Sequence, residues 1–314
     1  MVYIRWYFMH SFWVLSNFVF AQDSKLPMVA IPDLNGLLNV RDFCISDDQL
    51  EVYFTLQSQQ QDISRIACIQ KAKRGLENPQ LLTFSSRYND LEPFLSPDQH
   101  RLYFASNRPL SGLIGPAKDF DIWYVQRQSL QEGWGIPQRL DSTVNSVDDE
   151  FYPCVTSSGN LYFTRDSKNG LGHDDLYFCK WSNGHYKTAE LLDTIINSSG
   201  YEFNAFVSRD ESTLIYTRYN VPGGLGSGDL YISHRDQYGN WTSPKNLGAP
   251  INSPAMDYCP YYDETNGTLY FTSRKNQLIQ QEWNHWKEMI DYISKDANGC
   301  SKVYSLKYQL PEHR

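Results

Sequence analysis

Carboxylates recur at one position of a repeated pattern, and they are the residues best placed to do chemistry. An acidic residue lies three positions before a proline or, in one copy, an alanine. The four acids are Asp90, Glu150, Glu202 and Asp257. Repeated carboxylates can accept backbone N–H bonds and so cap a loop. They can also bind Ca²⁺, which prefers several oxygen ligands, or receive a basic segment of a partner protein.

A pair of these acids would also suit the hydrolysis of a sugar chain, because glycosidases use one carboxyl group as an acid and another as a base or nucleophile. Glu150 and Glu202 are the candidate pair for this alternative. The two groups must then differ in pKa, yet nothing in the sequence distinguishes one acid from the others. The sequence contains no GxSxG, HExxH or P-loop motif, so other common catalytic classes are not indicated.

A strand-like phrase of aliphatic and aromatic residues recurs five times and indicates which elements carry the acids. The copies begin at Val52, Leu102, Leu161, Leu214 and Leu269, at steps of 50, 59, 53 and 55 residues. A period of about 50 residues with strand-type residues is typical of a β-propeller. We therefore expect an all-β, five-bladed propeller over residues 22–314. The expected blades span about residues 40–86, 87–146, 147–198, 199–253 and 254–310.

The first strand of each blade lines the channel of a propeller, so the four acids should form a ring at one mouth. Val40 takes the acid position in the first blade, which leaves a gap in the predicted ring.

A second repeated signal marks the outer strand of each blade. A leucine is followed four residues later by an aliphatic residue and then asparagine, as after Leu140, Leu192 and Leu247. A further copy begins at Leu34, before the first blade, whereas the last repeat stops after its third strand. Residues 31–39 are therefore predicted to complete the last blade and close the ring, which removes its open edges. A sixth blade, the alternative, would need strands within residues 275–298.

Residues 275–298 instead carry apolar side chains at three- and four-residue spacing, the pattern of an amphipathic helix. Trp283, Trp286 and Ile290 belong to this pattern. We expect one short helical insertion, which either covers a blade edge or forms a docking element for a partner beside the channel.

The N-terminal residues 1–21 resemble a secretory signal, with Arg5 as the only charge before an apolar run. The alternative for this segment is an uncleaved membrane anchor. Its removal takes away one of the 28 basic residues and none of the 36 acidic ones, so the remaining net charge is −9. This charge argues against nucleic acid as a partner. The cysteines lie mostly within predicted strands and form no CxxC pair, so we expect mostly free thiols.

Several of these phrases together resemble the WD40-like repeats of the bacterial TolB-like propeller family. They are Pro93–Asp98, the Leu-Tyr-Phe strands, Asp121–Trp123 and Trp241–Gly248, and the resemblance covers about residues 30–310. It implies an envelope location, periplasmic or at the cell surface, and the binding of partners through a propeller face or the channel.

The sequence thus predicts an exported, non-enzymatic binding scaffold that recognises an envelope protein or glycan through the acidic mouth and the insertion. No resident cofactor is expected, although a Ca²⁺ ion in the channel is compatible with the four acids. The alternative is a glycan-active enzyme that uses channel carboxylates, because one propeller scaffold serves many functions.

Overall fold

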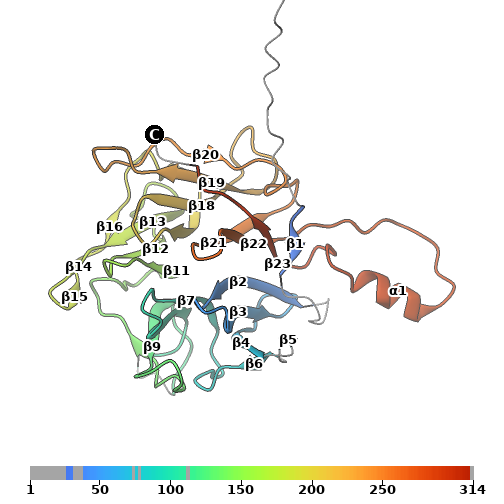
Figure 1. The fold of residues 1–314 in the computed structure, drawn as a ribbon, viewed down its shortest axis with the longest axis horizontal. Helices are drawn as coiled ribbons and strands as arrows, with labels where there is room; N and C mark the ends of the chain where they lie inside the picture. Colours follow the sequence, from blue (N-terminus) through green and yellow to red (C-terminus); the bar gives the residue numbers. More distant parts are fainter. Residues whose placement is uncertain (1–25, 31–37, 73–74, 77–78, 111–113, 312–314) are drawn as a thin grey trace, which may run out of the picture.

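The structure is a nearly all-β ring of five small antiparallel sheets, which confirms the predicted five-bladed propeller (Figure 1). The computed structural model describes residues 26–30, 38–72, 75–76, 79–110 and 114–311. The predicted signal segment 1–21 and residues 31–37 lie outside this description. The described part contains no helix that is both long and apolar enough to cross a membrane.

Each blade is a sheet whose strands follow one another from the channel to the rim. Blade I consists of β2 (Asn39–Ile45), β3 (Glu51–Gln57), β4 (Ser64–Ala72), β5 (Gly75–Leu76) and β6 (Gln80–Leu81). Blade II consists of β7 (Asp90–Leu95), β8 (Arg101–Ser106), β9 (Asp121–Gln126) and β10 (Gln138–Arg139). Blade III consists of β11 (Asp149–Val155), β12 (Leu161–Asp166), β13 (Asp174–Cys179) and β16 (Glu190–Leu191), beside the small hairpin β14 (Trp181–Ser182) and β15 (His185–Tyr186).

The last two blades follow the same order. Blade IV consists of β17 (Glu202–Val207), β18 (Thr213–Tyr219), β19 (Gly228–His234) and β20 (Lys245–Asn246). Blade V consists of β21 (Asp257–Asp263), β22 (Thr268–Ser273), β23 (Lys302–Lys307) and β1 (Met28–Val29). The five innermost strands are therefore β2, β7, β11, β17 and β21.

The repeated Leu-Tyr-Phe phrase forms the second strand of each blade and lies in the core. In β8, for example, Leu102, Tyr103 and Phe104 are all at most 2% exposed. A strand that is covered on both faces needs a continuous apolar run rather than an alternating one. One hydrophobic cluster extends through all five blades.

The repeated asparagine explains why the outer-strand signal is so regular. The side-chain amide of Asn197 accepts a hydrogen bond from the Leu176 N–H (2.8 Å) and donates one to the Leu176 carbonyl (2.9 Å). Asn145 makes the same pair of bonds with Ile122, and Asn252 with Leu230. Each amide thus acts as one more backbone-like partner for the third strand of its blade.

The N-terminal strand β1 completes blade V, as predicted, but it lies further toward the N-terminus than residues 31–39. Met28 and Val29 pair antiparallel with Ser305 and Tyr304 of β23, and the Ala30 N–H donates to the Val303 carbonyl at 2.8 Å. The first and last parts of the described chain therefore share one sheet.

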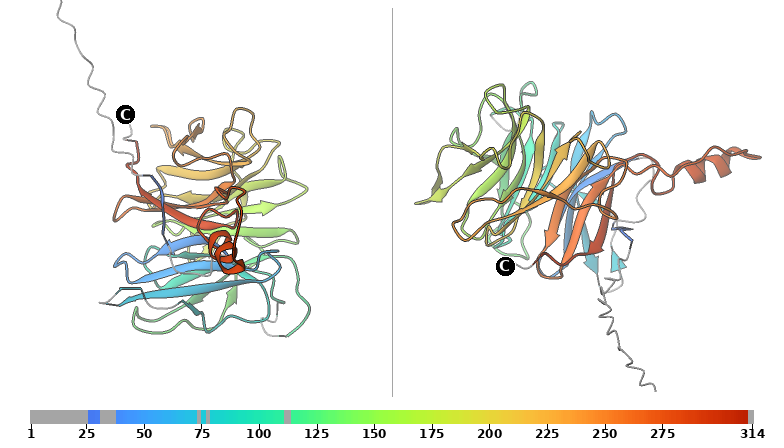
Figure 2. Two further views of the ribbon diagram at one scale, coloured as in Figure 1. Left: turned by 90° about the vertical axis from the view of Figure 1, so that its right-hand side faces the viewer. Right: turned by 90° about the horizontal axis from the view of Figure 1, so that it is seen from above.

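The insertion in blade V forms the short helix α1 (Trp286–Ile293) and no strands, so the six-bladed alternative is wrong. The helix projects away from the sheets (Figures 1 and 2). None of the six cysteines forms a disulfide, and four of them are buried.

Candidate functional site

Each innermost strand contains one β-bulge at the same place, and these bulges position the residues at the centre of the ring. The bulge residue has a positive φ of between 49° and 60° in all five blades, although none is glycine. These residues are Asp42, Glu92, Tyr152, Asn204 and Cys259. A positive φ costs energy for residues other than glycine, and a bulge re-aims a side chain. In the chain, each bulge residue follows the position of a predicted acid by two residues, as Glu92 follows Asp90.

A threonine of the preceding blade stabilises most of these bulges. The hydroxyl of Thr55 accepts the Glu92 N–H at 3.0 Å, and that of Thr164 accepts the Asn204 N–H at 3.0 Å. Thr272 does the same for Asp42 at 3.3 Å.

Blade III departs from this pattern. The residue of blade II that corresponds to these threonines is Ala105, which pairs with Leu91 as Thr55 pairs with Arg41. The Tyr152 N–H instead donates to the Oε2 atom of Glu92 at 2.7 Å. The Glu92 carboxylate therefore takes the place of the missing hydroxyl.

Two of the bulge residues are carboxylates, and one guanidinium bridges them. Arg41 donates from Nε to the Oδ1 atom of Asp42 and from Nη2 to the Oε1 atom of Glu92, both at 2.8 Å. The same Nη2 lies 3.5 Å from the Cys259 sulfur. Asp42 is 1% exposed and Glu92 is 4% exposed. The second oxygen of Asp42 is buried and has no hydrogen-bond partner among the described residues.

Two buried carboxylates beside one buried guanidinium favour the binding of a proton in this cluster. Burial raises the pKa of Glu92 to about 8, and the neighbouring charge of Asp42 adds to the effect, while Arg41 opposes it. A neutral Glu92 leaves the pair of Arg41 and Asp42 with no net charge. Glu92 is therefore protonated near neutral pH and can act as an acid.

A cavity of about 440 Å³ opens above this cluster on the axis of the ring. All five innermost strands contribute to its wall. Aromatic side chains of three blades line it: Phe151, Phe203, Tyr219 and Tyr258. Aromatic side chains beside polar groups are suited to bind a ligand with apolar and hydroxylated faces.

The channel is closed beyond the cluster, so the cavity is a blind pocket and not a pore. The ring of Tyr261 lies at the opposite end, with centroids 5.6 to 6.2 Å from those of Phe43, Phe94 and Phe206. A pocket of only about 20 Å³ lies among the residues around Tyr261. We call the 440 Å³ cavity the axial pocket.

Asp174, the first residue of β13, is the second carboxylate that lines the axial pocket. Burial raises its pKa to about 6, and the nearby carboxylates of Asp166 and Asp175 contribute, while His173 opposes them. Its side chain accepts no hydrogen bond from the described residues, which leaves it open to a ligand. Asp174 is thus mostly ionised at a pH at which Glu92 is mostly protonated.

The four predicted acids do not line the axial pocket, because each is buried and bound to its own blade or to the loop that enters it. Asp90, Glu150, Glu202 and Asp257 are at most 1% exposed. The carboxylates of Glu150, Glu202 and Asp257 accept the backbone N–H of Ser146, Ser198 and Ser253, respectively. The prediction of an open acidic ring is corrected: these carboxylates cap the loops that enter the innermost strands.

Arginines of the second strands and the loops after them neutralise three of these acids. Arg108 binds Asp90 at 2.6 Å, Arg165 binds Glu150 at 2.7 Å, and Arg218 binds Glu202 at 3.1 Å.

The aspartates at the start of the third strands have other partners. Asp175, for example, accepts hydrogen bonds from the Leu171 and Gly172 N–H groups. A Cβ atom at Gly170 would lie 2.0 Å from the Asp175 carboxylate, so a larger residue there would displace this side chain.

The predicted docking residues of the insertion do not reach the axial pocket either. Trp286 is 70% exposed, Ile290 is 41% exposed, and no residue of α1 is buried. Trp283 contacts Tyr292 within the insertion, with ring centroids 4.9 Å apart. The insertion therefore does not cover a blade edge, the first of its two predicted roles.

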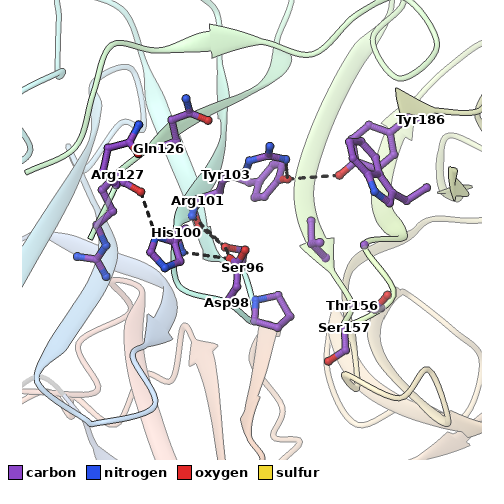
Figure 3. Close-up of a pocket in the computed structure, with 15 residues that line it drawn as sticks. Ser96, Asp98, His100, Arg101, Tyr103, Gln126, Arg127, Thr156, Ser157 and Tyr186 are labelled. Carbon is purple, nitrogen blue, oxygen red and sulfur yellow. Dashed lines mark hydrogen bonds between the residues drawn. The ribbon is translucent and has the colours of Figure 1, made fainter. Parts of the chain in front are cut away.

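A larger groove of about 480 Å³ lies between blades II and III (Figure 3). The hydroxyls of Tyr103 and Tyr186 face each other across it at 3.4 Å, with Arg101 beside them. Its one carboxylate, Asp98, accepts the Ser96 hydroxyl and the His100 N–H. With a single carboxylate that is already bound, this groove lacks an acid and base pair.

The described residues contain no group of three or more His, Cys, Asp or Glu side chains arranged to hold a metal ion. The acids proposed for Ca²⁺ belong to different blades, and each is already bound to an arginine or a serine.

No family model matches the sequence, and no curated protein matches it. Solved structures match the fold. An α-L-arabinofuranosidase from Podospora anserina, in complex with cellotriose, is 9% identical with a TM-score of 0.51, over 91% of this chain and 96% of that one. A GH43 endo-arabinanase from Bacillus licheniformis is 11% identical with a TM-score of 0.50, over 85% and 93%. A putative TolB from Agrobacterium tumefaciens is 13% identical with a TM-score of 0.47, over 77% and 72%.

These similarities show the five-bladed propeller fold and do not single out the TolB-like family. Three solved structures with a TM-score of 0.50 or more are glycoside hydrolases, and against them the prediction of a non-enzymatic scaffold is corrected. The residues proposed for the glycan-active alternative also change, because Glu150 and Glu202 are bound within their blades. Sequence reasoning missed Asp42, Glu92 and Asp174. For the first two a signal was present: they are the only acids at the five bulge positions.

Proposed function

We propose that the protein is a glycan-active enzyme that cleaves a glycosidic bond in the axial pocket. Glu92 is the general acid, and Asp174 is the partner carboxylate that activates water or attacks the sugar. The observation that carries this proposal is the presence of two carboxylates with unequal environments in one blind, aromatic-walled pocket. Glycoside hydrolysis requires such an inequality, because one group must give a proton while the other is ionised.

The proposed reaction follows from the position of each group. Neutral Glu92 protonates the glycosidic oxygen as the bond to the leaving sugar breaks, and positive charge develops on the sugar ring. The ionised Asp174 either accepts a proton from the water that attacks the anomeric carbon, or bonds to that carbon itself. In the second case, water that gives its proton to Glu92 then displaces Asp174 and releases the sugar. Arg41 then faces an ionised Glu92 and stabilises it at 2.8 Å. The aromatic walls hold the sugar and exclude water from the reacting bond.

The test is turnover of a panel of plant and bacterial polysaccharides, measured as the release of reducing ends. We expect the Glu92→Gln and Asp174→Asn proteins to lose about 10²- to 10⁴-fold in kcat, the range for a missing acid or base. Glu150→Gln is the matched control, because Glu150 is an innermost-strand glutamate that is equally buried and bound to an arginine but lies outside the pocket.

Circular dichroism and thermal unfolding of each variant show that it is folded. The proposal fails if the wild-type protein releases no reducing ends from any substrate, or if the Glu92→Gln protein is as active as the Glu150→Gln protein.

A further inference from the structure

Blade V contains a basic residue, Arg274, that has no counterpart among the residues that neutralise the innermost-strand acids. In blade II, Ser106 lies opposite Asp90, and Arg108, two positions later, reaches back to bind that acid. In blade V, Ser273 lies opposite Asp257, so Lys275 corresponds to Arg108. Lys275 supplies a positive charge near Asp257. Arg274, between them, corresponds to Asn107 and is left over from this arrangement.

The Arg274 side chain lies in the wall of the axial pocket, with its charge unbalanced. Its Nε atom donates to the Ser301 hydroxyl at 3.2 Å, and its guanidinium lies 5.7 Å from the centroid of the Tyr258 ring. Among the described residues, no carboxylate forms an ion pair with Arg274, and its two Nη groups have no hydrogen-bond partner. This differs from Arg41 in the same pocket, which is bound to two carboxylates.

Acidic residues on blade III determine which side of the pocket can bind a negatively charged group. Asp174 lies opposite Asp166 in the sheet of blade III, and Asp166 lies opposite Asp149. These three acids repel an anion from the blade III side of the pocket. On blade V, the guanidinium of Arg274 has free N–H groups that favour an anion, and its planar fork matches a carboxylate.

We propose that Arg274 binds the carboxylate of a uronic acid, so that the axial pocket selects acidic glycans over neutral ones. This inference rests on the proposed function, and it names the class of substrate. The uronate ring lies with its carboxylate toward blade V and its glycosidic bond toward Glu92 and Asp174. Sulfated sugars share the negative charge but not the planar, two-oxygen geometry that a guanidinium fork matches best.

The test compares oligosaccharides of galacturonate and of glucuronate with their carboxyl-reduced counterparts, which differ only in that group. We expect the wild-type protein to favour the acidic forms in kcat/KM. The Arg274→Gln protein should lose about 10- to 100-fold on the acidic forms, the effect of one hydrogen-bonded charge pair, and little on the neutral ones. Arg101→Gln is the matched control, because Arg101 also lacks a carboxylate partner but lines the groove between blades II and III (Figure 3).

Binding of the same oligosaccharides by calorimetry separates this inference from the proposed function. Turnover of reduced and acidic forms at equal kcat/KM, or an unchanged Arg274→Gln protein, overturns the role of Arg274 and leaves the enzyme proposal intact. Uronate binding that is lost in the Arg274→Gln protein, without turnover by any protein, supports the role of Arg274 while the enzyme proposal fails. Stronger binding of sulfated than of carboxylated sugars would reject the uronic acid as ligand.

Discussion

Two kinds of buried carboxylate occur on the innermost strands, and their partners separate them. Glu150 and Glu202 each have an arginine of the same blade and backbone N–H donors, so they are fully occupied. Asp42 and Glu92 share a single arginine between them. The first arrangement is repeated and stabilises the blades, whereas the second occurs once and leaves a proton available at the pocket. The carboxylates that repeat in several blades therefore stabilise the fold, whereas the pair that occurs once is the candidate for chemistry.

The unequal pKa values predict a bell-shaped dependence of kcat/KM on pH. The rate should rise as Asp174 ionises, with a pKa of about 6, and fall as Glu92 loses its proton, with a pKa of about 8. Initial rates between pH 4.5 and 9.5 measure this profile. A rate that still increases above pH 9 would contradict the role of Glu92 as the acid.

Protein stability gives an independent measure of the same group. A carboxyl whose pKa is raised from 4.5 to about 8 on folding binds its proton more tightly in the folded state. The free energy of unfolding therefore falls as the pH rises between these two values, by up to about 1.4 kcal/mol per pH unit. The Glu92→Gln protein lacks this dependence. From pH 5 to pH 8, its free energy of unfolding should therefore increase relative to that of the wild-type protein. Denaturant unfolding at pH 5 and pH 8 measures it.

Among the structural elements, the bulges in the innermost strands are the ones that position the residues of the site. Each bulge turns one side chain toward the axis, and a hydroxyl of the neighbouring blade stabilises the strained backbone in three cases. Ala105 breaks this pattern and leaves Glu92 to accept the Tyr152 N–H. Glu92 thus has a structural role as well as the proposed chemical one.

The structural role can be separated by restoring the pattern. Glu92→Ala leaves the buried Tyr152 N–H without a partner, which should cost about 1–3 kcal/mol of stability. Ala105→Thr in the Glu92→Ala background should recover part of this loss, because a threonine hydroxyl serves the corresponding N–H in other blades. It should not recover turnover. Denaturant unfolding and activity of the single and double variants measure the two roles, and a double variant no more stable than Glu92→Ala would contradict the substitution of carboxylate for hydroxyl.

The insertion shows what a periodic pattern predicts and what it does not. The apolar spacing predicted a helix, and α1 spans eight residues of that stretch. Its bridge between Asn276 and Asn298 closes the base of the insertion. The apolar face is not covered by the blades, since Trp286 is 70% exposed. A hydrophobic period identifies the face of a helix but not its neighbour.

At the scale of the whole molecule, closure of the ring keeps the five innermost strands around one axis. Strand β1 supplies the rim strand of blade V, so residues from both ends of the described chain hold one sheet together. The axial pocket depends on this closure, because its wall includes residues from every blade.

Removal of β1 should therefore weaken both the ring and the pocket. A protein that begins at residue 31 loses the pairing of Met28 and Val29 with β23 and exposes that strand as an open edge. We expect a lower Tm by several degrees, which corresponds to about 1–2 kcal/mol for a chain of this size. A protein that begins at residue 26 keeps β1 and is the matched control. Equal Tm values for the two proteins, measured by calorimetry, would show that β1 does not stabilise the ring.

The fold class, the number of blades and the closure by an N-terminal strand were all predictable from local sequence patterns. These properties depend on local patterns, such as apolar runs, turn glycines and the repeated asparagine. The patterns recur at a regular period because every blade packs against its neighbours in the same way. The same regularity misled the search for the site: the acids that repeat, Glu150 among them, serve the blades.

Which carboxylates meet at the axis could not be predicted without the folded ring. Arg41, Glu92, Asp174 and Arg274 belong to four different blades and share no motif, and they become neighbours because the ring brings distant bulges and strand ends to one pocket. Their charges also depend on this convergence, since burial and the neighbouring ions raise the pKa of Glu92 to about 8. The local chain specifies the blade, whereas a site on the axis exists only when all five blades are in place.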